Sequence, residues 1–214
     1  GLPFHYLLRW PCSPFTAVGL VLGLVSFFNI LYGTLVGISK FEVKDIEFHH
    51  PNLPKAFDGY RIVQLSDIHI GSWIDNEKTI NELVELVNAQ KPDLIVFTGD
   101  LVNQRSCELE GFQDILAQLH AKDGVYSILG NHDYGSYYHW KNLKEQVNNI
   151  DNLIRMQKTM GWKLLNNEYD ILHHEGDSIA LIGVENDGEP PFSQFADLKK
   201  ATKGTDGMFR ILLS

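Results

Sequence analysis

Three short polar clusters are the residues of this chain best suited to chemistry. They are Asp67-Ile68-His69, Gly99-Asp100 and Gly130-Asn131-His132-Asp133. Each cluster follows an apolar run, so we expect each to leave the carboxyl end of a buried strand, where open α/β sheets place their ligand sites. Imidazole nitrogens together with carboxylate and amide oxygens suit hard divalent cations such as Mn, Mg or Fe. The clusters therefore predict a metal centre.

The spacing also suggests how the ligands are shared. Asp67 and His69 are two residues apart at a strand end, so both side chains point to the same side and can hold one ion. Asp100 can supply a carboxylate shared by two ions, Asn131 an oxygen for the second ion, and His132 a phosphate-binding group or general acid. Two ions about 3.5 to 4 Å apart can polarise a phosphoryl group and generate hydroxide at neutral pH. Each cluster alone also fits a turn or a helix cap, and only their combination predicts hydrolysis of phosphate esters.

The elements that must position these clusters alternate along the chain. Apolar residues at spacings of three and four predict one helix through Ile80–Val87 and a second through Phe112–Leu119, between three apolar strands. A longer helical region is expected to end near Met160. This order predicts parallel strands with right-handed crossovers, and two sheets packed between helices. The expected strands are 60–66, 93–98, 125–129, 162–165, 169–173, 179–184 and 209–214.

The first 39 residues differ in composition from the rest. No charged residue occurs between Trp10 and Ser39, and residues 15–38 are long enough to cross a hydrocarbon layer as a helix. We interpret this stretch as a transmembrane helix; the competing interpretation, a removable signal peptide, would have a shorter apolar core. Arg9 before it and two lysines after it do not decide its orientation. Because residue 1 is Gly rather than Met, we expect the natural protein to begin earlier.

Length and composition limit the remaining possibilities. With 214 residues, 44% of them hydrophobic, the chain can form one α/β domain and a small extra element. We divide it into a membrane segment (1–39), a linker with an edge strand (40–59) and a domain (60–214). The net charge of -9, without a basic stripe, predicts no nucleic-acid partner. Cys12 and Cys107 are too few for a disulfide framework, and the chain has neither a Walker loop nor a G-x-S-x-G elbow.

The three clusters resemble the motifs of the calcineurin-like metallophosphoesterase family, D-x-H, G-D and G-N-H-D. The flanks Phe57–Ile62 and Gly161–Glu168 resemble its bacterial membrane-anchored branch, and the resemblance covers residues 41–214. It implies a four-layer αββα sandwich, two divalent metal ions (Mn, Fe, Mg or Zn) and a phosphate ester as substrate. The membrane helix adds the lipid bilayer as a partner and suggests a bacterial inner (plasma) membrane location.

The resemblance also implies roles for individual residues. By position, Asp67, His69 and Asp100 would bind one ion, Asp100 and Asn131 the other, and His132 would be the catalytic acid. Some relatives have an aspartate that orients this histidine where Asn103 stands here, and an asparagine can hold the ring with less effect on its pKa.

A second departure from the family pattern concerns the C-terminal part. Family members carry three further histidine ligands after the last strand seen here, and the chain ends at Ser214 before any of them. We therefore expect weak metal binding and little activity from these 214 residues alone.

Other residues have weaker claims to a role. The histidine pairs at 49–50 and 173–174 are adjacent in sequence, so each pair is expected to point to opposite faces rather than to one ion. Aromatic residues near the motifs are expected either to line a substrate or lipid cleft or to be ordinary, partly buried residues, and the strand end at 185–187 to shape that cleft. These aromatic residues are Trp73, Tyr134, Tyr137, Tyr138 and Trp140.

Two function classes follow. The leading one is a membrane-anchored, metal-dependent phosphoesterase that hydrolyses phosphomonoesters or phosphodiesters, with lipid-linked substrates suggested by the anchor. The rival is a catalytically inactive, membrane-anchored scaffold or interaction protein that keeps the fold. A nuclease is disfavoured by the acidic charge balance.

Overall fold

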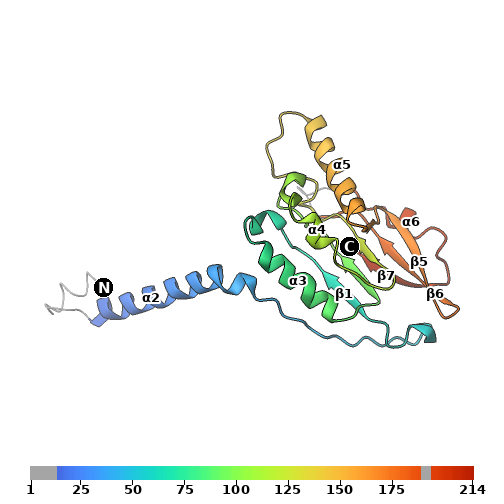
Figure 1. The fold of residues 1–214 in the computed structure, drawn as a ribbon, viewed down its shortest axis with the longest axis horizontal. Coiled ribbons are helices and arrows are strands. Elements are labelled where there is room, and N and C mark those ends of the chain that lie inside the picture. The colour runs from blue at the N-terminus through green and yellow to red at the C-terminus, as the bar shows by residue number, and fades with distance from the viewer. Residues whose placement is uncertain (1–13, 189–193) are drawn as a thin grey trace. The chain divides into compact units, whose positions relative to one another are not determined.

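The computed structural model describes residues 14–188 and 194–214, and the chain divides into two compact units, Gly1–Glu47 and Phe48–Ser214. Arg9 and Cys12 lie outside the described residues. Helix α2 (Pro14–Leu35) forms most of the described part of the first unit (Figure 1). Within the described ranges it is the one helix long and apolar enough to cross a membrane, with a mean hydropathy of 2.0 over its most apolar window.

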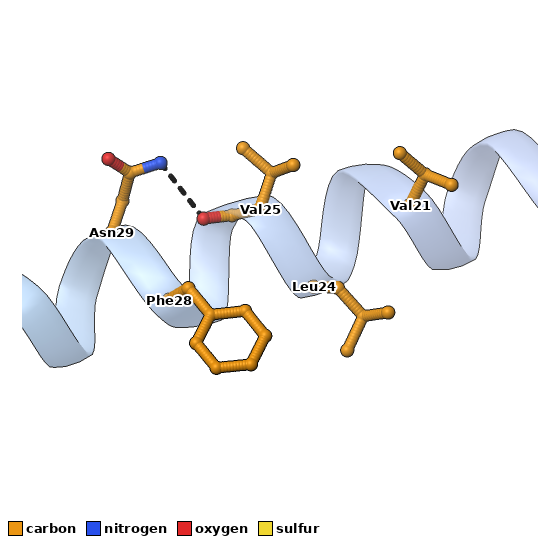
Figure 2. Close-up of a pocket in the computed structure, with 5 residues that line it drawn as sticks. All are labelled: Val21, Leu24, Val25, Phe28 and Asn29. Carbon is orange, nitrogen blue, oxygen red and sulfur yellow. Dashed lines mark hydrogen bonds between the residues drawn. The ribbon is translucent and has the colours of Figure 1, made fainter.

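Helix α2 ends three residues before the predicted limit at residue 38. The chain tightens into a 3-10 turn over Gly37–Ser39 instead of continuing as α-helix. Figure 2 shows five side chains of α2 that line a pocket, among which Asn29 donates from its side-chain Nδ2 to the carbonyl of Val25 at 2.9 Å. This polar side chain thus satisfies a hydrogen bond within its own helix.

The second unit contains two sheets. The first has four parallel strands in the order β1 (Ile62–Leu65), β2 (Leu94–Phe97), β3 (Val125–Ser127) and β4 (Lys163–Leu164). They are connected by α3 (Glu77–Ala89), α4 (Gln113–Leu116) and α5 (Leu143–Thr159). The predicted parallel β-α-β-α-β order is therefore confirmed.

The second sheet has three strands. Strands β5 (Glu168–His174) and β6 (Asp177–Gly183) pair antiparallel, and β6 pairs in parallel with β7 (Phe209–Leu213). The short helix α6 (Leu198–Ala201) lies in the connection from β6 to β7 (Figure 1).

The two sheets pack face to face. One buried cluster combines Val96 and Tyr126 of the first sheet with Ile179 and Leu181 of the second. A separate cluster joins the other face of β6 to Ala201 of α6. The apolar positions of α3 are buried as its periodicity predicts. The central strands β2 and β6 are buried along most of their length, which agrees with the predicted αββα layering.

Two local predictions were wrong. Residues 41–48 form no strand, because a strand needs a hydrogen-bonded neighbour and the alternating side chains here, such as Val43 and Ile46, are exposed rather than packed on a sheet. The helix expected through Phe112–Leu119 has regular α-helical geometry only in α4, although its four apolar positions are buried. In this segment, irregular turns bury the apolar side chains as well as a longer helix would.

Candidate metal centre

The first two clusters adopt an unusual backbone conformation. Asp67, His69 and Asp100 have φ values of 55°, 46° and 60°, in the left-handed region that side chains other than glycine rarely adopt. Backbone hydrogen bonds hold the two turns together, from Asp67 N to Gly99 O at 3.0 Å and from His69 N to Asp100 O at 3.0 Å. Such strain costs about 1–3 kcal/mol per residue and is concentrated at functional sites.

Two glycines let the second and third clusters touch. Gly99 has φ +98°, and a Cβ placed on it would lie 2.5 Å from the backbone nitrogen of Gly130. A Cβ on Gly130 would lie 2.3 Å from Oδ1 of Asp100. That same Oδ1 accepts a hydrogen bond from His132 N at 2.9 Å. The glycines of both motifs are therefore required by close packing of the loops.

The Asp133 carboxylate connects the loop of the second cluster to that of the third. Asp133 is fully buried, and its carboxylate accepts four backbone hydrogen bonds. Oδ2 accepts from Asp100 N and Gly130 N, each at 2.9 Å, and Oδ1 accepts from Leu101 N at 2.9 Å and Val102 N at 3.1 Å. Burial raises the pKa of the Asp133 carboxyl to about 7, while these amides favour its ionised form. This carboxylate fixes the backbone that presents Asp100.

The structure brings the predicted donor groups together. His69, Asp100 and His132, from three separate loops, place ligand atoms within 4.8 Å of one another. His69 Nε2 is 3.8 Å from Asp67 Oδ1 and 3.8 Å from Asp100 Oδ2, too far for direct hydrogen bonds. Carboxylate and imidazole groups that converge without bonding to one another are a suitable donor set for a divalent cation. These three residues therefore fit a divalent cation, although the group includes His132, which the sequence predicts as the acid, and not the predicted ligand Asp67.

Solvent exposure differs across this group. The Asp67 side chain is 65% exposed, that of His69 29% and that of Asp100 13%. Asp67 also accepts a hydrogen bond from the hydroxyl of Ser66. The site is thus open to solvent on the side of the first cluster and closed on the side of Asp100.

His132 is held through the main chain rather than through a carboxylate. Its Nδ1 is 2.7 Å from the backbone carbonyl oxygen of Asn103. A carbonyl can only accept, so Nδ1 carries the proton in this contact, and Nε2 is the nitrogen left for proton transfer. The Asn103 side chain donates from Nδ2 to Ser72 Oγ at 3.0 Å, and its buried Oδ1 has no hydrogen-bond partner among the described residues. Asn103 therefore contacts His132 through its backbone carbonyl and not through its side chain.

Glu108 fixes the carbonyl that holds this histidine. Its carboxylate accepts from Asn103 N at 2.6 Å, Gln104 N at 3.3 Å and Arg105 N at 3.0 Å. A Cβ on Gly71 would lie 2.6 Å from Glu108 Oε2, so the first loop packs closely on this carboxylate. Sequence reasoning did not identify Glu108, because no motif marks a glutamate that acts on backbone amides.

Asn131 was predicted as a ligand and has a partner that the sequence does not indicate. Its Nδ2 donates to the phenol oxygen of Tyr137 at 2.7 Å. The Tyr137 ring also packs against the His132 ring, with centroids 4.7 Å apart. In the sequence, the only indication of this contact is that Tyr137 is an aromatic residue shortly after the third cluster.

The other candidate aromatic residues support the loops. Trp73 is buried and donates from Nε1 to the carbonyl of Ile68, within the first cluster. Tyr134 is buried and donates to Glu185 Oε1 at 3.2 Å; burial, followed by the nearby Glu185 carboxylate, raises its pKa well above the usual range. Trp140 donates to the carbonyl of Gly135 at 2.7 Å. The group of metal-binding side chains found in the described ranges includes none of the four paired histidines.

Comparison with known proteins identifies the family. A model described as calcineurin-like phosphoesterase matches residues 60–205, which contain all three clusters and more than half of the chain. The chain belongs to the calcineurin-like phosphoesterase family. The resemblance seen in the motifs is thereby confirmed. At the level of the family, members are phosphoric ester hydrolases that typically bind divalent metals.

Similar proteins include both eukaryotic and bacterial members. A transmembrane protein with metallophosphoesterase domain from Danio rerio is 35% identical over 104 residues, 49% of this chain and 24% of that protein. The UDP-2,3-diacylglucosamine pyrophosphatase LpxG from Chlamydia trachomatis is 36% identical over 103 residues, 46% of this chain and 31% of that protein. The chain thus aligns with less than a third of the length of these calcineurin-like phosphoesterases. The solved structure of TT1561 from Thermus thermophilus superposes with a TM-score of 0.46 at 16% identity, over 72% of this chain and 66% of that one.

Proposed function

We propose that this chain forms the catalytic centre of a membrane-anchored, metal-dependent phosphoesterase that hydrolyses phosphomonoesters or phosphodiesters. The observation that carries the proposal is the convergence of His69, Asp100 and His132 from three loops to within 4.8 Å. Family membership supports the class of reaction.

In this proposal the donors divide between two ions. Asp67 and His69 would hold one ion, Asn131 the other, and Asp100 both. Bound divalent ions would polarise the phosphoryl group and lower the pKa of bound water. The close approach of Gly99 and Gly130 supports this assignment, because it brings the Asp100 carboxylate against the third cluster.

His132 would act as the general acid. Its Nδ1–H is committed to the Asn103 carbonyl, so the transferable proton is held at Nε2 and passes to the leaving oxygen.

The experiment is a hydrolysis assay on the full-length protein in detergent, with bis-p-nitrophenyl phosphate, p-nitrophenyl phosphate and Mn²⁺. We expect turnover that falls at least about 100-fold in Asp100→Asn and His132→Ala, the usual range for loss of a positioned acid or base. His120→Ala, which removes an exposed loop histidine outside the centre, is the matched control. Wild-type activity in the Asp100 and His132 variants would contradict the proposal. Stable Mn²⁺ binding without turnover of any phosphate ester would favour the inactive scaffold.

We further propose a lipid-linked substrate and a bacterial inner membrane location. Helix α2 supports an anchor, and the similar Chlamydia protein is named for a pyrophosphatase of a diacylated sugar nucleotide. Hydrolysis should then be faster for a phosphate ester carried on an acyl chain in vesicles than for its short-chain, water-soluble analogue. Equal rates for the two substrates would contradict lipid specificity, and recovery of the protein outside the inner membrane fraction would contradict the location.

A further inference from the structure

Tyr137 contacts two neighbouring residues of the centre at once. Its phenol oxygen accepts from Asn131 Nδ2 at 2.7 Å, and its ring packs against that of His132 with a 4.7 Å centroid distance and a 38° tilt. We propose that Tyr137 is a positioning residue that turns the Asn131 amide so that its oxygen faces the metal. This inference rests on the function proposed above.

The two ends of a side-chain amide differ in what they can bind. An asparagine side chain can rotate and exchange its oxygen and nitrogen, but only the oxygen can ligate a cation, because the NH₂ group is a donor. A phenol that accepts from Nδ2 fixes one of the two orientations. Partners that orient ligands typically change metal affinity 10- to 100-fold when they are mutated.

The loop between Asn131 and Tyr137 is tied down at several points. Gly135 N donates to His132 O at 2.9 Å, and Tyr138 N donates to Gly135 O at 3.2 Å. Gly135 has φ +63°, and a Cβ on it would lie 2.8 Å from the Gln104 carbonyl oxygen. The backbone that carries Tyr137 is therefore fixed in place, although its side chain is 46% exposed.

The same ring also confines His132. The His132 imidazole makes two other contacts. It meets the His69 ring edge-on with centroids 4.7 Å apart, and its Nδ1 bonds to the Asn103 carbonyl. Tyr137 adds a third constraint on this imidazole. Loss of the whole ring should therefore affect proton transfer, whereas loss of the hydroxyl alone should affect only the amide.

The test measures binding of Mn²⁺ alone to the full-length protein in detergent by titration calorimetry. Tyr137→Phe should weaken one of two binding steps about 10-fold and leave the other unchanged. The neighbouring Tyr138→Phe is the matched control and should bind as wild type, since the Tyr138 ring contacts Trp140 and Arg105 instead. Unchanged Mn²⁺ affinities in Tyr137→Phe would overturn the inference.

A second background separates positioning from general support of the fold. Asn131→Asp places an oxygen at both ends of the side chain, so no orientation is required. In that background Tyr137→Phe should have no effect on Mn²⁺ affinity, whereas a merely structural role predicts the same loss in both backgrounds and would overturn the inference. If the wild-type protein binds no Mn²⁺ at all, the proposed function fails first, which distinguishes the two.

Discussion

Replacement of Asp133 by asparagine tests how the three loops are held together. The two side chains have nearly the same size, so the change affects hydrogen bonding rather than packing. In Asp133→Asn one carboxylate oxygen becomes an NH₂ group, and whichever end is replaced, two backbone N–H groups lose their acceptor. The site is fully buried, so water cannot take the place of that oxygen.

The expected loss follows from these contacts. Each buried, unsatisfied donor costs about 1–3 kcal/mol, so two of them cost about 2–6 kcal/mol. Removal of a buried charge offsets part of this loss, because desolvation is the main cause of the raised pKa of Asp133. We therefore expect a net loss of about 2 kcal/mol from a total unfolding free energy of about 5–15 kcal/mol.

The assay is urea unfolding of the full-length protein in detergent, followed by tryptophan fluorescence. At pH 8 the Asp133 carboxyl, with its pKa of about 7, is mostly ionised in the folded wild type. With a typical slope of about 2 kcal/mol per molar urea, the midpoint should fall by about 1 M. Asp197→Asn is the matched control, because Asp197 caps α6 from the surface and asparagine caps as well as aspartate. A midpoint for Asp133→Asn equal to that of the control would show that the Asp133 carboxylate does not hold the loops together.

Three further predictions follow from the structure. Gly99→Ala should destabilise the protein by at least about 1 kcal/mol more than Gly111→Ala in the same urea assay, because both have positive φ but only the Gly99 Cβ meets backbone; equal losses would argue against close loop packing. Glu108→Gln should lower kcat about 10-fold with little change in KM, because it loosens the carbonyl that holds His132, the proposed general acid; a change in KM alone would contradict this. Burial acts to raise the pKa of Asp93, but hydrogen bonds from Lys122 and from a backbone amide outweigh it and lower that pKa. The stability that this contact contributes is therefore present above the ordinary pKa and lost as pH falls below about 4, so Asp93→Asn should flatten the acid limb of a melting-temperature profile.

Part of the site could be predicted from the sequence because parallel strands end at one edge of a sheet. Asp67, Asp100 and Asn131 follow three successive strands, so their convergence requires only the strand order and the right-handed connections. The helical periodicity of α3 and the apolar composition of α2 also depend on local sequence alone.

Tertiary structure decided which partner each group has. Nothing in the sequence tells that His132 bonds to the main chain of Asn103, that Glu108 fixes this carbonyl, or that Tyr137 meets Asn131. Likewise, the alternation in residues 41–48 could not show whether a neighbouring strand exists. Such contacts depend on the exact positions of atoms in separate loops, and loop conformation is set by packing and by shared backbone donors.

Side-chain types and the alternation of strands and helices along the chain can be read from the sequence, so the sequence shows which chemical groups are available and predicts that they gather at one edge of the sheet. Only the folded chain decided how the groups are oriented, since orientation depends on buried acceptors such as Asp133 that collect backbone N–H groups from separate loops.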